Sequence, residues 1–451
     1  MKCRLGQTLA LALLVASSGA LARAQQTLTL RQAIDRALGE NPQAAVAQAD
    51  QKDSAAAARL ARTALLPQLN FTEDMSRGND PVYVFGERLR QRQFTQADFA
   101  LNALNLPHPL GNFASRFSGS WLAFDSFRTE KQIHRADLFR KSADASASAA
   151  NQHIVLQVVE AYQQVLYAER AAEVARHEQQ TAEALAATAD QHVKAGLAVE
   201  SDRMAAEVNL AARKEESIAA EGAVDLAWAE LCTAMGTPNL PLQQLQPIEP
   251  HDFPQSPLAE EQAMAAKTRP DLTALNDVQR AQAEAVSAAR VDFGPRVSAY
   301  GNWEEDRGSL TSDGGHNWVA GLQVSVDILP FAKRDQLARE TAAQQKVNAQ
   351  KKLADQQIGL QVSQAHIERQ TASLQVATAR AAMAQAAESL RIVNNRYTAG
   401  LATITDLLRA QDAERESQSG YWRAVYGNAM AYAQLLYATG TLTPEAAEEL
   451  Q

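Results

Sequence analysis

Apolar and small residues recur at helical spacing over two very long stretches of the chain. Residues 120–195 contain neither glycine nor proline, and roughly seventy helical residues would extend about 105 Å at a rise of 1.5 Å per residue. Gly196 interrupts this stretch, and a return helix follows it. A second stretch covers residues 331–399, is interrupted at Gly400 and is also followed by a return helix. The pattern predicts two long antiparallel helical hairpins with matching glycine turns.

A narrow apolar stripe runs along the first long stretch. Its members alternate at spacings of four and three residues, as in a coiled coil: Ile154, Val158, Ala161, Val165 and Ala168. The side chains in the stripe are small, which lets neighbouring helices approach closely on both sides. Helices of this kind can assemble side by side into a cylinder.

Short segments with a period of two residues precede both long stretches. In residues 317–327 the apolar residues that share one side are Trp318, Ala320, Leu322, Val324 and Val326. A length of about 9–11 residues suits a tilted strand of an outer-membrane barrel. Trp121, Trp303 and Trp318 stand where an aromatic girdle would contact the membrane interface. The alternative is a pair of small soluble hairpins.

Four such strands are expected in each chain, residues 68–77 with 113–125 and residues 296–304 with 317–327. They cannot close a barrel, because the smallest transmembrane barrels have about eight strands. An open edge in lipid would leave backbone groups without hydrogen bonds. If these strands span a membrane, the protein must therefore oligomerise. A conducting pore favours three or more chains, since side chains fill the interior of a barrel with about eight strands.

The chain contains the same plan twice. Three landmarks recur in order: the pair Pro42 and Pro67 as Pro270 and Pro295, residues 117–125 as 319–327, and residues 194–202 as 398–406. The offset is 270 − 42 = 228 at the prolines and 202–204 at the later landmarks. The first copy therefore carries a longer loop between the prolines and the second landmark. Chance similarity of alanine-rich helices is the alternative.

We expect five segments along the chain. They are a signal peptide (1–24), a first repeat (25–236), a proline-rich connector (237–257), a second repeat (258–440) and a C-terminal tail (441–451). The connector holds six of the 15 prolines. Helix cannot continue through it, so we expect it to lie outside the helical bundle.

Residues 1–24 are typical of a secretory signal peptide. Lys2 and Arg4 precede a short apolar run, and residues 22–24 (Ala-Arg-Ala) provide a cleavage site. A buried first helix is the alternative. Cys3 lies before the apolar run, so we do not expect it to be lipidated. No later window holds 18 consecutive apolar residues, and no transmembrane helix is expected.

Composition and charge narrow the classes of function. The 451 residues carry 43 Lys and Arg against 52 Asp and Glu, a formal charge of −9; cleavage would leave 40 − 52 = −12. This acidic balance argues against a nucleic-acid partner. Cys232 alone would remain in the mature chain, in an apolar helical setting that predicts a buried thiol. The eight histidines are scattered, and no nucleotide-binding or hydrolase motif occurs, so we expect no enzyme, no metal site and no cofactor.

The combination resembles the TolC family of outer-membrane efflux proteins over residues 27–440. The resemblance rests on the opening TLTLRQAIDRALGENP, the turn RYTAGLATITDLLRAQ and the duplicated AGL turn. The segment DPVYVFGERLRQRQFTQADFALNALN is similar to the first extracellular loop of many members. The resemblance implies a mainly α fold with a β-barrel part: a homotrimer with a 12-stranded barrel in outer-membrane lipid and a 12-helix periplasmic tunnel. The connector would form a belt around the waist of the tunnel.

The resemblance also implies roles for the two hairpin turns. They would contact the periplasmic adaptor of an inner-membrane pump through Lys194, Ala195, Gly196, Leu197, Thr398, Ala399, Gly400 and Leu401. The alternative is that these residues are simply exposed turns.

The family gate lies at the same end of the tunnel. By resemblance, Tyr397 would donate a hydrogen bond to Asp202, and three copies of Asp406 would form an acidic ring. Such a ring would bind cations and resist anions. Ala402 replaces a gating arginine and Arg409 replaces a second ring aspartate, which predicts a looser gate and puts the strength of the ring in doubt. Without the resemblance, both aspartates would be acids favoured at helix starts.

The function implied is a passive, gated exit duct in the outer membrane, extending into the periplasm. A pump of the RND, ABC or MFS type would supply the energy, and adaptor binding would open the gate, in a multidrug efflux or type I secretion system. The alternative class is a periplasmic coiled-coil adaptor or structural protein without a pore. The sequence does not identify the cargo, because tunnel walls of this kind look alike.

Overall fold

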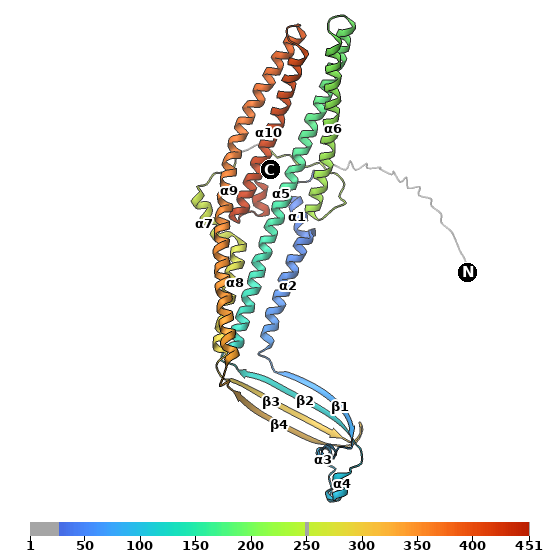
Figure 1. The fold of residues 1–451 in the computed structure, drawn as a ribbon, viewed down its shortest axis with the longest axis vertical. Helices are drawn as coiled ribbons and strands as arrows, with labels where there is room; N and C mark the ends of the chain where they lie inside the picture. The colour runs from blue at the N-terminus through green and yellow to red at the C-terminus, as the bar shows by residue number, and fades with distance from the viewer. Residues whose placement is uncertain (1–26, 249–251, 451) are drawn as a thin grey trace, which may run out of the picture.

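The computed structural model describes residues 27–248 and 252–450, and the predicted signal peptide lies outside these residues. The described chain is elongated, with long helices at one end and a sheet at the other (Figure 1). The long helices form two hairpins that stand side by side: α5 (Arg128–Lys194) with α6 (Glu200–Met235), and α9 (Phe331–Thr398) with α10 (Ile404–Thr439). Both predicted hairpins are therefore present.

Each hairpin is accompanied by a broken pair of shorter helices. These are α1 (Leu30–Glu40) with α2 (Pro42–Thr63), and α7 (Leu258–Thr268) with α8 (Pro270–Val291). The break occurs at Asn41-Pro42 and at Arg269-Pro270, because proline has no N–H to continue the helix. At each break a side chain donates to the end of a return helix: Asn41 Nδ2 to Ala234 O at 2.8 Å, and Arg269 Nη1 to Ala438 O at 3.2 Å. The duplication thus extends to equivalent tertiary contacts.

The ends of the two return helices are also equivalent. Gly236 and Gly440 follow α6 and α10 with φ of +76° and +73°, a region that favours glycine. A Cβ added at Gly236 would lie 2.6 Å from Glu40 O, and one at Gly440 would lie 2.8 Å from Arg269 Cα. Both positions therefore need glycine for its backbone conformation and for its small size.

Four antiparallel strands form one sheet in the order β1-β2-β3-β4, with β1 and β4 at its edges. They are β1 (Gln68–Gly78), β2 (Leu110–Phe124), β3 (Arg296–Arg307) and β4 (Gly314–Ser325). The second predicted pair of strands was expected at residues 296–304 and 317–327. At the outer end of the sheet, β3 and β4 both extend beyond these residues. The two pairs join through β2 and β3, where Phe117 lies opposite Trp303.

A long insertion, which we call the β1–β2 arm (residues 79–109), connects the first two strands. It contains α3 (Pro81–Arg90), the short 3₁₀ helix η1 (Gln96–Phe99) and α4 (Leu101–Asn105). The arm lies at the end of the sheet that is far from the helices (Figure 1). It accounts for the longer loop expected in the first copy.

The main apolar core lies at mid-height, where α1, α5, α6 and α10 meet. The predicted stripe of Ile154, Val158, Ala161, Val165 and Ala168 is buried there, as is Cys232. The connector contributes Leu245, Ile248 and Phe253 to the same core. None of the described helices has a stretch long and apolar enough to cross a membrane.

The connector is held against the helices by specific contacts. The Tyr162 hydroxyl of α5 donates to Leu28 O at 2.8 Å and lies 3.0 Å from Gln246 O, where Leu28 pairs with Leu245 in a parallel bridge. The Phe253 ring stacks on Tyr432 of α10, with centroids 4.5 Å apart. These contacts fasten the connector across helices from both repeats.

Candidate functional site

The two hairpin turns at the far end of the helices have the same backbone structure. Gly196 and Gly400 adopt φ of +77° and +72°. The following amides donate to the helix before them, Leu197 N to His192 O and Leu401 N to Arg396 O, both at 2.8 Å. Leu197 is 77% exposed and Leu401 is 69% exposed. Each tip therefore presents a large apolar side chain that nothing in the described chain covers.

The eight residues expected at the tips all lie in or beside these turns. All eight are exposed: Lys194, Ala195, Gly196, Leu197, Thr398, Ala399, Gly400 and Leu401. The Lys194 ammonium pairs with Asp190 one turn earlier at 2.6 Å. The geometry suits a contact surface.

Tyr397 and Asp202, the expected gate pair, lie near each other on different hairpins. Tyr397 belongs to an apolar cluster that packs the hairpins together near the tips and includes Leu185, Ile404 and Leu407. Burial raises the pKa of the Tyr397 hydroxyl, and the charge of Asp202 raises it further. Among the described residues, no hydrogen bond joins the two side chains, so the pair is close but not bonded within one chain.

Asp406 has a local structural role at the start of α10. Its carboxylate accepts hydrogen bonds from Thr403 Oγ1 at 2.7 Å and Thr403 N at 3.0 Å, which completes a capping box. These bonds, and then the charges of Arg409 and Arg396, lower the pKa of Asp406. Both Asp406 and Arg409 are exposed. The alternative interpretation of Asp406 as a helix-start acid thus describes its role within one chain.

A set of charges farther from the tips also joins the two hairpins. Arg213 of α6 donates to Asp412 of α10 at 3.1 Å, and its other amino group lies 2.6 Å from Glu216. Arg415 of α10 lies 3.9 Å from Glu216. We call the Arg213–Asp412 pair the inter-hairpin tie. Sequence reasoning missed it, since the partners are 199 residues apart.

Two buried carboxylates lie beside the inter-hairpin tie. Glu178 of α5 and Glu414 of α10 are 7% and 8% exposed. Burial raises the pKa of Glu178, and the charge of Glu414 raises it further, while Arg213 and Arg415 oppose the shift. The interface between the hairpins is therefore polar here, unlike the apolar cluster at the tips.

One face of the sheet is apolar and exposed from the helices to the level of Trp303, and nearer its outer end the same face also carries Glu73, Ser115, Glu305 and Arg307. The strand register places Leu69, Phe71, Phe117, Trp121, Trp303, Trp318, Leu322 and Val324 on this apolar face. Trp303 lies directly opposite Trp318, whereas Trp121 lies opposite Ala299, nearer the helices. Trp318 is 78% exposed and Leu322 is 74% exposed. The three tryptophans thus share a face and occupy two levels along it.

The opposite face of the sheet is polar. The register places Asn70, Thr72, Asp74, Arg116, Ser118, Ser120, Asn302, Glu304 and Asp306 on this polar face. Arg116 Nη2 donates to Glu304 Oε1 at 2.8 Å. The sheet therefore separates an apolar environment from a polar one.

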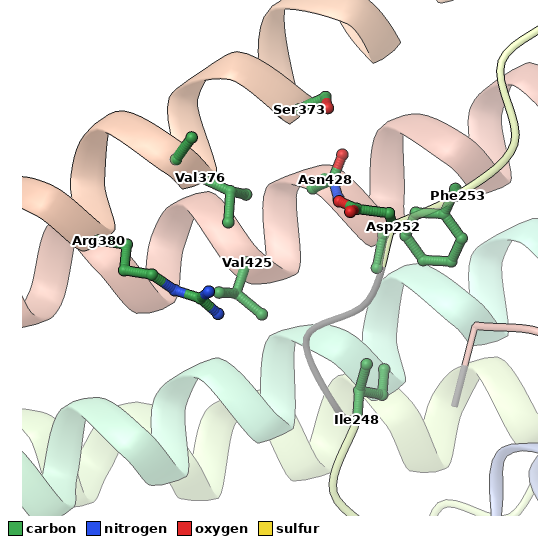
Figure 2. A pocket seen from close by; sticks show the side chains of 10 residues that line it. Ile248, Asp252, Phe253, Ser373, Val376, Arg380, Val425 and Asn428 are labelled. Atoms are coloured by element: carbon green, nitrogen blue, oxygen red, sulfur yellow. The ribbon is translucent and has the colours of Figure 1, made fainter.

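A shallow pocket lies between the connector and the helices α9 and α10 (Figure 2). Its larger apolar side chains are Ile248, Phe253, Val376 and Val425, and its polar side chains are Asp252, Ser373, Arg380 and Asn428. Close by, the buried Arg369 donates to Phe253 O at 2.6 Å and to Asn428 Oδ1 at 3.3 Å. The residues around this pocket therefore hold the connector against α9 and α10. Within the part of the chain that the structure describes, no group of His, Cys, Asp or Glu is arranged to hold a metal.

The sequence profile of the outer membrane efflux protein family matches residues 33–237 and 263–441. The alkaline protease secretion protein AprF of Pseudomonas aeruginosa is 23% identical over 394 residues, which are 85% of this chain and 78% of AprF.

Solved structures are similar in fold. The CmeC outer membrane channel of Campylobacter jejuni has a TM-score of 0.79 at 17% identity, with 91% of this chain and 85% of CmeC covered. The outer membrane protein VceC of Vibrio cholerae has a TM-score of 0.76 at 18% identity, with 91% and 96% covered. These likenesses confirm the expected fold class of long helical hairpins with a sheet.

Proposed function

The chain belongs to the outer membrane efflux protein family, and from this premise we propose that it is the exit duct of a tripartite efflux or type I secretion system. Members of the family are outer-membrane channels rather than enzymes, are trimeric, and work with adaptors and inner-membrane pumps. In our proposal the duct is passive. A periplasmic adaptor opens it, and an RND, ABC or MFS pump supplies the energy.

The observation that carries the proposal is the sheet with one apolar face, one polar face and two open edges. An apolar, tryptophan-bearing face suits lipid, and a polar face suits water. The unpaired edges of β1 and β4 need partners, because lipid cannot satisfy backbone hydrogen bonds. Three copies would supply twelve strands, enough for a water-filled interior. The same arrangement disfavours a periplasmic adaptor without a pore, which would have no use for an exposed apolar sheet face.

The tips are the proposed contact with the adaptor. Leu197 and Leu401 protrude from equivalent turns at the end opposite the sheet, where an inner-membrane partner would approach. The proposed gate lies just behind them, at Asp202, Tyr397, Asp406 and Arg409. Because Asp406 is exposed, three copies brought together by symmetry could repel one another and attract cations.

The relatives leave the cargo open between two classes. AprF is named for secretion of alkaline protease, whereas the family is described by efflux. We propose no single cargo, because selection belongs mostly to the pump.

Membrane fractionation tests the proposal directly. We expect the protein in the outer-membrane fraction, as a trimer that dissociates on gels after heating, and we expect purified protein to form channels in planar bilayers. Purely soluble recovery without a heat-sensitive trimer would refute the duct.

Leu197→Ser with Leu401→Ser should keep the trimer and the channel but weaken adaptor capture. The double change Leu69→Ala with Leu322→Ala, on the apolar sheet face, is the matched control that leaves the tips intact.

A further inference from the structure

The first part of the β1–β2 arm, α3 and the residues that follow it, contacts the polar face of the sheet at its outer end, whereas α4 lies beyond that end (Figure 1). At β1, the Tyr83 hydroxyl lies 2.9 Å from Ser76 Oγ. At β4, Arg92 Nη2 donates to His316 O at 2.7 Å. Between these points the arm contacts β2 and β3, so it touches all four strands at their outer ends.

The central contact is a buried network of polar side chains, which we call the arm latch. Asn112 of β2 donates from one amide group to two carboxylates, Glu87 Oε2 at 2.6 Å and Asp306 Oδ1 at 2.8 Å. Gln91 of the arm donates to Asn112 Oδ1 at 2.9 Å and to Gly111 O at 2.9 Å. Asp306 is fully buried and Asn112 is 3% exposed. Buried polar groups of this kind hold one geometry, because each partner is costly to leave unpaired.

A glycine in β4 permits the close approach of the arm. A Cβ added at Gly315 would lie 1.8 Å from Arg90 O, a backbone atom of the arm. Gly315 lies opposite Asp306 in the register and so belongs to the polar face. The backbone of the arm is therefore seated directly on the sheet at this point, and any larger residue would displace it.

We propose that the β1–β2 arm is a second constriction of the duct, seated at its outer mouth and limiting the size of solutes that pass there. The inference rests on the proposed function, in which the polar face lines the water-filled interior. Three copies of the arm would then lie inside the outer end of the barrel. Bulky cargo would have to displace the arm from Gly315 and from the arm latch.

The sheet register permits a clean removal of the arm. Gly78 and Leu110 are directly paired, so an Asn-Gly turn in place of residues 79–109 can join β1 to β2 without shifting the register. Gly315→Ala is a second, milder variant that displaces the arm. Gly301→Ala is its matched control, because a Cβ there would lie 3.9 Å from its nearest neighbour, an ordinary contact.

The readout is the reaction of a single cysteine inside the barrel. Ser120→Cys, in a Cys232→Ser background, places a thiol on the exposed part of the polar face, below the arm. Intact cells are treated from outside with a small methanethiosulfonate or with a maleimide carrying a polyethylene glycol chain. We expect the arm to exclude only the bulky reagent. Removal of the arm, and Gly315→Ala, should abolish this size discrimination, whereas Gly301→Ala should keep it.

Two results would overturn the inference, and they are distinguishable. Unchanged size discrimination in both arm variants would show that the arm does not limit access, while leaving the duct itself intact. Ala320→Cys, on the apolar face, tests the orientation of the sheet. If Ala320→Cys reacts with aqueous reagents and Ser120→Cys does not, the proposed function fails and the role of the arm fails with it.

Discussion

Loss of the inter-hairpin tie should favour opening of the tunnel. Arg213 is 11% exposed at its side chain and Asp412 is 54% exposed, and their bond joins the return helix of one hairpin to that of the other. If opening moves the hairpins apart, this bond exists only in the closed form. Arg213→Ala should remove this bond, because Ala cannot supply the donor, and Asp412→Asn should weaken it, because Asn keeps an acceptor oxygen but not the charge.

The size of the effect follows from the exposure of the pair. A partly exposed ion pair contributes about 1 kcal/mol at most. Three copies in a trimer would contribute about 3 kcal/mol to the closed form, which corresponds to roughly a hundredfold change in the closed-to-open equilibrium at about 1.4 kcal/mol per factor of ten. The second pair of Arg213, with Glu216 at 2.6 Å, lies within α6 and is present in both forms, so its loss in Arg213→Ala should not change the closed-to-open equilibrium.

Single-channel recording in planar bilayers measures the open probability of each variant. We expect Asp412→Asn to raise it, and we expect the double variant with Arg213→Ala to exceed Arg213→Ala alone by little, since both changes act on the same pair. Arg391→Ala is the matched control, because its partner Glu388 lies on the same helix, α9. Equal open probability in Asp412→Asn, Arg391→Ala and the unmodified protein would refute the reasoning.

Four further outcomes are expected. Gly236→Ala should lower the temperature at which trimers dissociate on gels by far more than Gly196→Ala, because both glycines have positive φ but a Cβ at Gly236 would meet the backbone of Glu40, whereas a Cβ at Gly196 would meet open space. Asp202→Ala with Tyr397→Phe should raise single-channel conductance, and an unchanged value would remove both residues from the gate. Asp406→Ala should weaken channel block by multivalent cations; undiminished block would place the acidic constriction elsewhere. Burial raises the pKa of Glu87, with Asp306 and Glu304 adding to the shift and Arg90 and Arg116 opposing it. Protonation of Glu87 therefore stabilises the arm in contact with the sheet. This stabilisation is lost as the pH rises from the ordinary pKa of 4.5 through the raised pKa of Glu87. Labelling of Ser120→Cys by the bulky reagent, relative to the armless protein, should accelerate over that window, and Glu87→Gln should abolish the pH dependence.

Much of the fold follows from local features of the sequence. The glycine turns at Gly196 and Gly400, the helix breaks before Pro42 and Pro270, and the alternation in β3 and β4 act over a few residues each. Such features can be interpreted without knowledge of the rest of the chain. The positions of the two tips were predictable for the same reason, whereas the shared face of Trp303 and Trp318 also depends on the pairing of β3 with β4.

The candidate site was only partly predictable. The spacing of the repeated landmarks placed Tyr397 and Asp202 near the same end of the two hairpins. It could not decide whether their side chains form a hydrogen bond, and in the single chain they do not. Asp406 proved to cap α10 through Thr403, which the sequence allowed as an alternative. Whether three copies also form a ring depends on an interface between chains.

By itself, the sequence determined two copies of one plan, four long helices, their turns and the alternating faces of the strands. Only the tertiary structure decided how distant segments meet: β2 with β3 across the two copies, Arg213 with Asp412, and Asn112 with Asp306, whose positions differ by 194 residues. The physical reason is the separation in sequence between the residues that interact. Turns, breaks and periodicity arise from neighbouring residues, whereas the arm latch and the inter-hairpin tie require the whole chain to bring side chains from separate elements within hydrogen-bonding distance.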